Sequence, residues 1–154
     1  MSSTRAAALA VQVEHAAEAV IALVDDIQSG RWMHVPSPGV WSVGKDVEHL
    51  AEASAYHQWI IRMTIGQPVS ARRPRLERDH LTTDLSPHDA IDLLRHHAEE
   101  GANLIRALTD EQLDLPTRPP RAKNQKLAET IEQVLIGHLH GHCDDIESKL
   151  GDPI

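Results

Sequence analysis

The sequence predicts an all-α protein: a four-helix bundle formed by one domain over residues 1–154. Four stretches place apolar residues at i, i+3, i+4 and i+7, the spacing of one helix face. Aromatic residues make up only 3% of the chain and phenylalanine is absent, whereas 41% of the residues are apolar. A composition dominated by small and aliphatic side chains suits helix packing better than sheet packing.

Charge and cysteine content exclude several classes of protein. The formal net charge is −8, which argues against a nucleic-acid partner. Cys143 is the single cysteine, so an internal disulfide is impossible and a reducing cytoplasm is the expected compartment. We find neither a signal-peptide core nor an apolar run of spanning length, and we therefore expect no membrane partner.

The first two helices are expected over residues 4–27 and from Ser42 to Gly66. The first ends at Ser29 and Gly30, and residues 31–41, with two prolines, should form an ordered loop. Ser42 is a suitable N-cap for the second helix. We expect two tryptophans of this region to fill the ends of the bundle, Trp32 and Trp41.

Residues 67–85 form a long connection between the second and third helices. Such a length exceeds what an antiparallel helix pair needs, so the segment either crosses the bundle or covers a functional opening. Four arginines make it locally basic, and it is either a solvated loop or a binding loop for an anionic ligand: Arg72, Arg73, Arg75 and Arg78. The first three are the residues we assign to such a loop.

The third and fourth helices complete the bundle. Ser86 and Pro87 open the third as N-cap and first turn, and Thr109 begins a short turn after it. The fourth helix is expected from Lys126 to Leu150.

Two histidines of the fourth helix fall on its apolar stripe, one turn apart. His138 follows Val134 and Leu135, and His142 follows His138 by four residues. A buried imidazole without a partner costs roughly 1–3 kcal/mol, and a metal ion bound by both rings would offset that cost. The alternative is a structural pair bonded to neighbouring side chains. His140 points away from the stripe and should lie on the surface.

A metal site needs a further ligand, because two imidazoles from one helix are too few. His49, early in the second helix, would lie level with the pair if the second and fourth helices run antiparallel. His57 is the competing choice if those helices are offset by two turns. Asp46 and Asp145 could orient a ligand by accepting from its second ring nitrogen.

These residues resemble a known family. Trp41-Ser42-Val43, then Glu48-His49-Leu50, a long connection, and the final GHLHGHCDDIE look like the DinB / YfiT-like superfamily of metal-binding four-helix bundles. The similarity covers almost the whole chain in element order. It implies a metal triad of His49, His138 and His142, an up-down-down-up bundle, homodimerisation, and a divalent metal that is zinc, nickel or iron.

The resemblance also implies an activity. The superfamily includes S-transferases and isomerases that use bacillithiol, mycothiol or glutathione. By analogy, the metal would bind such a thiol as thiolate and present it to a small electrophilic substrate. The basic loop would then be one clamp for a carboxylate-bearing thiol. No catalytic side chain is indicated, so metal-bound water or thiolate would be the reacting group.

Two other functions remain open at this stage. A metal-dependent hydrolase would activate water at the same position, and a non-catalytic bundle or stress-response protein would use the histidines to hold two helices together. A fourth protein ligand would favour the structural role, and an open coordination position would favour catalysis. Cys143 beside His142 is a poor nucleophile pair, because neighbours in a helix point about 100° apart.

Overall fold

The computed structural model describes residues 2–121 and 124–153. Four long helices dominate this part of the chain: α1 (Thr4–Val24), α3 (Val43–Ile65), α4 (Pro87–Arg106) and α7 (Gly137–Gly151). Three short helices accompany them: α2 (Ser29–Met33), α5 (Asp110–Leu113) and α6 (Leu127–Thr130). A π-helical segment, η2 (Ile131–Ile136), joins α6 to α7 without a break. The all-α expectation is therefore confirmed for the described residues.

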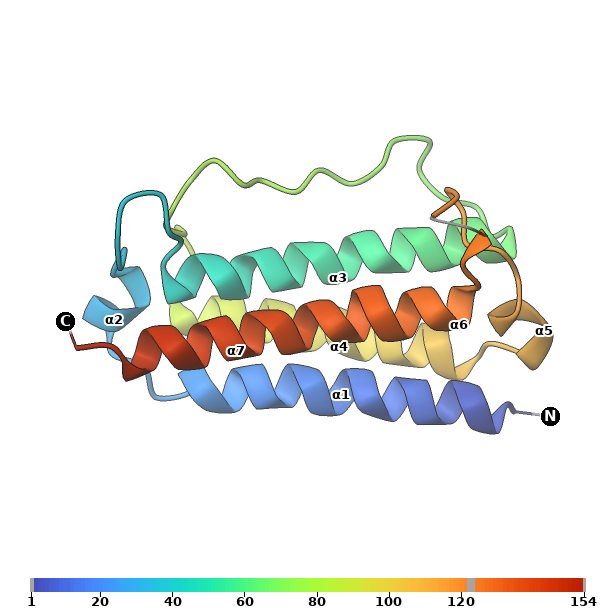
Figure 1. Ribbon diagram of the computed structural model, residues 1–154, viewed down its shortest axis with the longest axis horizontal. Coiled ribbons are helices and arrows are strands. Elements are labelled where there is room, and N and C mark those ends of the chain that lie inside the picture. The colour runs from blue at the N-terminus through green and yellow to red at the C-terminus, as the bar shows by residue number, and fades with distance from the viewer. Residues whose placement is uncertain (1, 122–123, 154) are drawn as a thin grey trace.

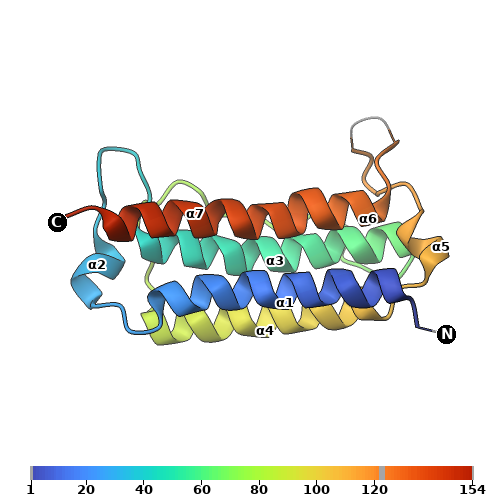
Figure 2. The same cartoon turned by 60° about the horizontal axis from the view of Figure 1, so that its bottom comes forward.

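The long helices pack as a bundle of four. Helix α1 contacts α4 and α7, and α3 contacts the same two helices, so α1 and α3 lie on opposite corners. Figures 1 and 2 show the four side by side, with residues 67–85 running back along α3 to the start of α4. Because α3 and the continuous helix α6–η2–α7 run in opposite directions along the bundle, the early part of α3 lies beside α7.

Local signals set the helix boundaries largely as expected. The Ser42 hydroxyl accepts from the amide of Lys45, and Gly66 ends α3 in the left-handed conformation at φ 78°. The Ser86 hydroxyl likewise accepts from the amide of Asp89 at the start of α4. Because each cap satisfies amides or carbonyls that a helix end leaves without partners, these positions fix where the helices start and stop.

The first segment differs from expectation. Helix α1 ends at Val24 rather than residue 27, and the region expected to be a stop and a loop contains α2. Trp32 of α2 is 1% exposed, and its indole N–H donates to the carbonyl of Leu85. A Cβ on Gly44 would come within 2.7 Å of the Trp32 ring, so glycine is required where α3 passes this side chain.

Helix α1 is long and apolar enough by composition to cross a membrane, which the sequence-based expectation did not foresee. Within the bundle, its Leu9, Val13 and Val20 side chains are buried against the other helices. In this structure the apolar residues of α1 therefore form the buried face of a core helix.

Candidate metal centre

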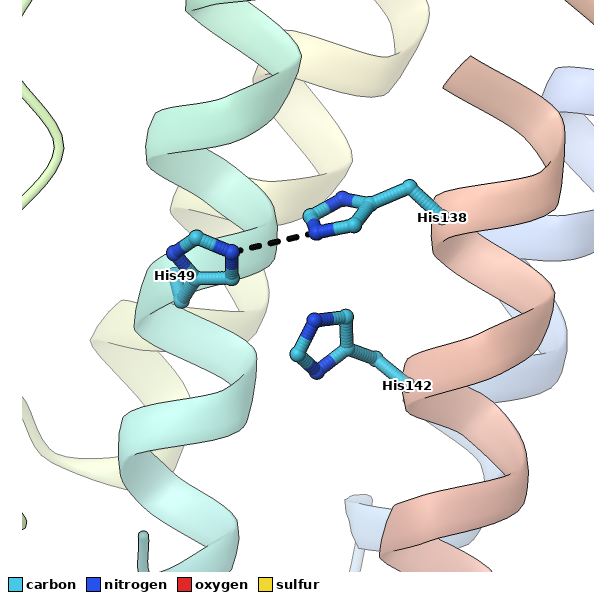
Figure 3. Close-up of side chains that lie close together, drawn as sticks. All are labelled: His49, His138 and His142. Carbon is cyan, nitrogen blue, oxygen red and sulfur yellow. Dashed lines mark hydrogen bonds between the residues drawn. The ribbon is translucent and has the colours of Figure 1, made fainter. Parts of the chain in front are cut away.

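Three histidines converge between α3 and α7. His49 lies in the second turn of α3, whereas His138 and His142 lie in the first two turns of α7. Figure 3 shows all three rings directed into the space between the two helices. One ring nitrogen from each histidine lies within 4.8 Å of the others, and the Nε2 atoms of His49 and His138 are 3.1 Å apart.

The π-helical segment changes how the histidines face the core. With α-helical spacing throughout, His138 and His142 would continue the buried stripe of Leu127 and Ile131, as the sequence suggested. The wider turn of Ile131–Ile136 takes up an extra residue, and the buried stripe continues through Leu139 and Ile146 instead. The two imidazoles are consequently half-buried beside that stripe, where they face His49. Insertions of this kind often occur at functional sites.

Burial keeps the imidazoles neutral. Desolvation and the neighbouring imidazoles lower the pKa of His49 to about 3, and desolvation and His142 lower that of His138 to about 4. The charge of Arg78 adds to both shifts. Since a metal binds the neutral form of imidazole, these two rings are ready to act as ligands at neutral pH.

The donor set fits a divalent transition metal. Three imidazoles match the ligands that zinc, nickel and iron accept. A hydrogen bond between the two Nε2 atoms satisfies both of them, one as donor and one as acceptor, whereas Nδ1 of His49 is buried without a hydrogen-bond partner among the described residues. The cluster therefore offers three ring nitrogens close enough to bind one ion, and one of its imidazoles has a further nitrogen without a partner.

Asp46 supports one of the rings from behind. Its Oδ1 lies 3.1 Å from Nδ1 of His142, and Lys149 donates to its other oxygen. The Asp46 side chain is only 2% exposed, so its carboxylate is held out of water between these two partly buried groups. Because Nδ1 of His142 faces the carboxylate, its Nε2 is left available for a metal. Asp145, the other residue expected in this role, is instead exposed on α7.

The structure separates the remaining histidine candidates. His57 is buried beside His138, with 5.8 Å between ring centroids, and lies outside the cluster of three nitrogens. Burial and His138 lower the pKa of His57 to about 3. His140 is exposed, as expected. Cys143 is half-buried among apolar side chains, and its raised thiol pKa, caused by burial and nearby carboxylates, makes it a poor nucleophile.

Trp41 covers the cluster rather than filling a bundle end. Its ring centroid lies 4.9 Å from that of His49 and 6.2 Å from that of His142. Its indole N–H donates to the carbonyl of Arg78, 3.3 Å away. This bond joins the wall of the histidine cluster to the long connection.

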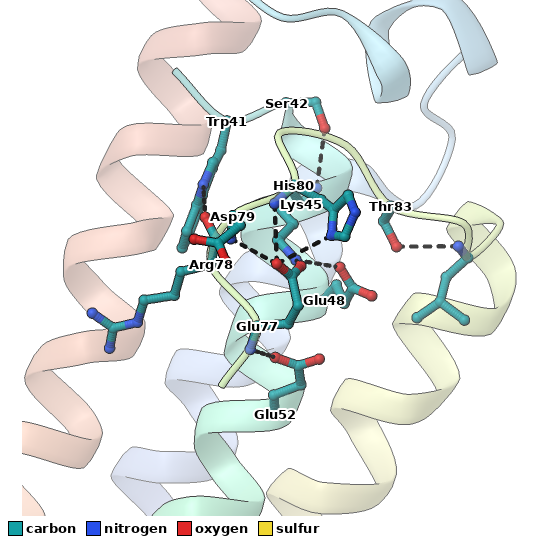
Figure 4. A network of polar contacts seen from close by, with 11 residues as sticks. Trp41, Ser42, Lys45, Glu48, Glu52, Glu77, Arg78, Asp79, His80 and Thr83 are labelled. Atoms are coloured by element: carbon teal, nitrogen blue, oxygen red, sulfur yellow. Dashed lines mark hydrogen bonds and ion pairs between the residues drawn. The ribbon is translucent and has the colours of Figure 1, made fainter. Parts of the chain in front are cut away.

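A buried lysine anchors the same connection to α3. Lys45 is 1% exposed, and its ammonium contacts Glu77 at 2.6 Å and Glu48 at 2.9 Å (Figure 4). Bonding to Lys45 holds the pKa of Glu77 at about 2, so this contact persists across neutral pH. The sequence did not single out Lys45 or Lys149. The available signal was that each lysine lies about one helical turn from an acidic residue, Glu48 and Asp145 respectively, which is a spacing typical of ion pairs.

The arginines predicted for an anion-binding loop are only partly brought together. Arg73 and Arg75 line one pocket, joined by Arg78 of the same connection and by Arg121 from a distant part of the chain. Arg72 is exposed and is not among the residues that line this pocket.

A second group of possible ligands lies on α4. His96, His97 and Glu100 each place one donor atom within 4.8 Å of the other two. His96 and Glu100 are exposed, and both imidazoles already lie near the Glu100 carboxylate, at 3.3 and 3.7 Å. This group therefore lies on one helix face with two of its three members exposed, although Nδ1 of His97 is buried without a hydrogen-bond partner among the described residues.

Comparison with known proteins yields one match. The family model of the DinB superfamily matches residues 12–146, which run from within α1 through most of α7. No curated protein and no solved structure gave a significant match. Since the matched region covers most of the chain and contains the three converging histidines, this protein belongs to the DinB superfamily.

Proposed function

We propose that this chain is a divalent-metal-dependent transferase that joins a low-molecular-weight thiol to a small electrophilic substrate. His49, His138 and His142 would hold the ion. Within residues 2–121 and 124–153, no fourth histidine, cysteine or carboxylate belongs to their cluster. Structural zinc sites have four protein ligands, whereas catalytic ones have three and an open position. This difference is the observation that most favours catalysis over a purely structural role.

A divalent ion in this place would supply Lewis acidity and a position at which a thiol is favoured as its anion. The protein's own residues prepare that position. Asp46 orients His142 through Nδ1, and burial keeps the imidazoles of His49 and His138 neutral. Trp41 covers one side of the rings and limits the access of water.

The proposed reaction balances without an oxidant or reductant. The S–H bond of the thiol and the bond between carbon and leaving group break, and a carbon–sulfur bond forms. The thiol proton and the leaving group depart together as the acid of the leaving group.

The experiment is a thiol screen with purified, metal-loaded protein. Bacillithiol, mycothiol and glutathione are each offered with a chloroaromatic electrophile, and thioether formation is followed by mass spectrometry. We expect product with one of the thiols, loss of activity in His138→Ala, and full activity in the matched variant His140→Ala. Ester hydrolysis without thiol would replace this proposal with the hydrolase, and metal binding without either activity would replace it with the structural role.

We also infer that the chain keeps the up-down-down-up order implied by the family resemblance. The colour gradient in Figure 1 supports this order, since α1 and α7 run one way and α3 and α4 the other. The connection over residues 67–85 then has to span the length of the bundle, which accounts for its size.

A further inference from the structure

A pocket of about 590 Å³ lies between α3 and the long connection. Four arginines dominate its walls, and the rest of the lining includes an aromatic and an aliphatic side chain: Tyr56, Arg73, Arg75, Leu76, Arg78 and Arg121. Pockets of roughly 300–1,000 Å³ are typical for small-molecule ligands. The pocket therefore has the size of a ligand site and an unusual concentration of positive charge.

That charge is not neutralised by the protein. Among the described residues, no carboxylate lies within ion-pairing distance of the four guanidinium groups. Three arginines outside the pocket, Arg5, Arg95 and Arg106, do pair with an aspartate or glutamate. In a chain of net charge −8, a pocket that gathers four arginines without acidic partners is charge-complementary to an anion from solution.

The pocket walls also favour a planar or forked anionic group. The guanidinium of Arg73 lies over the Tyr56 ring, 5.8 Å from its centroid, which holds the planar group in place. Guanidinium groups bind carboxylate and phosphate oxygens through two parallel N–H bonds. Figure 4 shows the guanidinium of Arg78 directed away from the carboxylates that contact Lys45.

Two sets of contacts connect this pocket to the histidine cluster. The backbone of Arg78 accepts from Trp41, whose ring lies against His49. On the other side, Tyr56 lies 5.8 Å from His57, and His57 lies 5.8 Å from His138, between ring centroids. A ligand held in the pocket would therefore be a neighbour of the three histidines.

We propose that the arginine pocket binds the polyanionic end of a small molecule, a group with at least two carboxylate or phosphate charges. The proposal rests on the proposed function only for what the rest of that molecule does at the histidine cluster. Binding of the charged end requires neither metal nor thiol. Arg73, Arg75, Arg78 and Arg121 would contact the anion, and Arg72 would not.

The experiment measures anion binding to metal-free protein by titration calorimetry. Citrate and pyrophosphate serve as probes, with acetate as the singly charged comparison. We expect one or both polyanions to bind at one per chain and acetate to bind at least about tenfold more weakly. Preference for citrate would identify a carboxylate ligand, and preference for pyrophosphate a phosphate ligand; either supports the proposal.

Matched variants locate the binding. Arg75→Gln and Arg121→Gln should each weaken polyanion binding by about tenfold or more, because each removes charged hydrogen-bond donors. Arg72→Gln removes the same charge from the same connection outside the pocket and should leave affinity within about twofold. Absence of binding by both polyanions, equal affinity for acetate, or equal weakening by Arg72→Gln would each overturn the proposal. None of these results depends on whether the protein transfers thiols.

Discussion

The two histidine clusters of this protein satisfy the same distance criterion and differ in almost everything else. His49, His138 and His142 come from two helices and lie in a half-buried space. His96, His97 and Glu100 come from successive turns of α4, and the cluster is mostly exposed. In the first, three ring nitrogens face one another between two helices. In the second, both rings lie near the Glu100 carboxylate and His96 and Glu100 are exposed, although Nδ1 of His97 is buried without a hydrogen-bond partner among the described residues.

This difference shows that proximity alone does not identify a metal site. An exposed imidazole is already well solvated, so an ion must compete with water and gains little. A buried imidazole without a partner has lost that solvation, and a bound ion restores the bonding. The cluster between α3 and α7 should therefore bind metal far more tightly than the cluster on α4.

The largest expected effect is the loss of a ligand. His138→Ala or His142→Ala should weaken metal binding by more than about 100-fold, beyond what loss of a supporting residue typically costs. Circular dichroism should show unchanged helical content. His140→Ala is the control for the same helix. Metal analysis of the purified variants checks this, and full retention of metal by His138→Ala would remove the distinction between the clusters.

A smaller loss of metal affinity is expected when the carboxylate that contacts His142 is removed. Asp46→Asn removes the carboxylate that faces His142, and losses of this kind typically reduce metal affinity about 10–100-fold. Asp145→Asn is the matched control. Asp145 is an exposed carboxylate on α7, so its loss should leave metal affinity unchanged. Competition with a fluorescent chelator measures both values. Equal affinities in the two variants would show that Asp46 does not support the ligand.

The cluster between α3 and α7 should also couple stability to pH in metal-free protein. The pKa of His138 is about 4 when folded, whereas its ordinary value is 6.5. As pH falls from 6.5 towards 4, the unfolded chain therefore takes up a proton that the folded chain does not, and stability falls by up to about 1.4 kcal/mol per pH unit. His138→Gln should reduce this slope in urea unfolding, and His140→Gln should not. A slope unchanged by His138→Gln would contradict the buried, neutral state of that ring.

The smallest effect is expected at the exposed cluster. The His96→Ala variant should still bind one metal ion per chain with unchanged affinity. His96 and Glu100 are exposed, and they lie on α4, whereas the other cluster lies between α3 and α7. Titration calorimetry with zinc at micromolar concentration checks this. If His96→Ala no longer bound this metal ion, the cluster on α4 would be the stronger metal site, contrary to our expectation.

Much of the site could be predicted from particular residues. The spacing of His138 and His142 placed both on one helix face, and Ser42 fixed the start of the helix that carries His49. The choice between His49 and His57 needed the axial offset of α3 and α7, which depends on packing between distant segments. Homodimerisation and a cytoplasmic location stay predictions of the sequence and its family resemblance.

Local chemistry in the sequence determined the helices, their caps, and the candidate histidines, because caps and apolar periodicity act over a few residues. Tertiary structure alone decided the rest. The π-helical turn rotated the histidines off the core stripe, and packing brought Asp46 to His142 and replaced Arg72 with Arg78 and Arg121 in the pocket. Those contacts join residues far apart in the chain, so no short-range pattern could specify them.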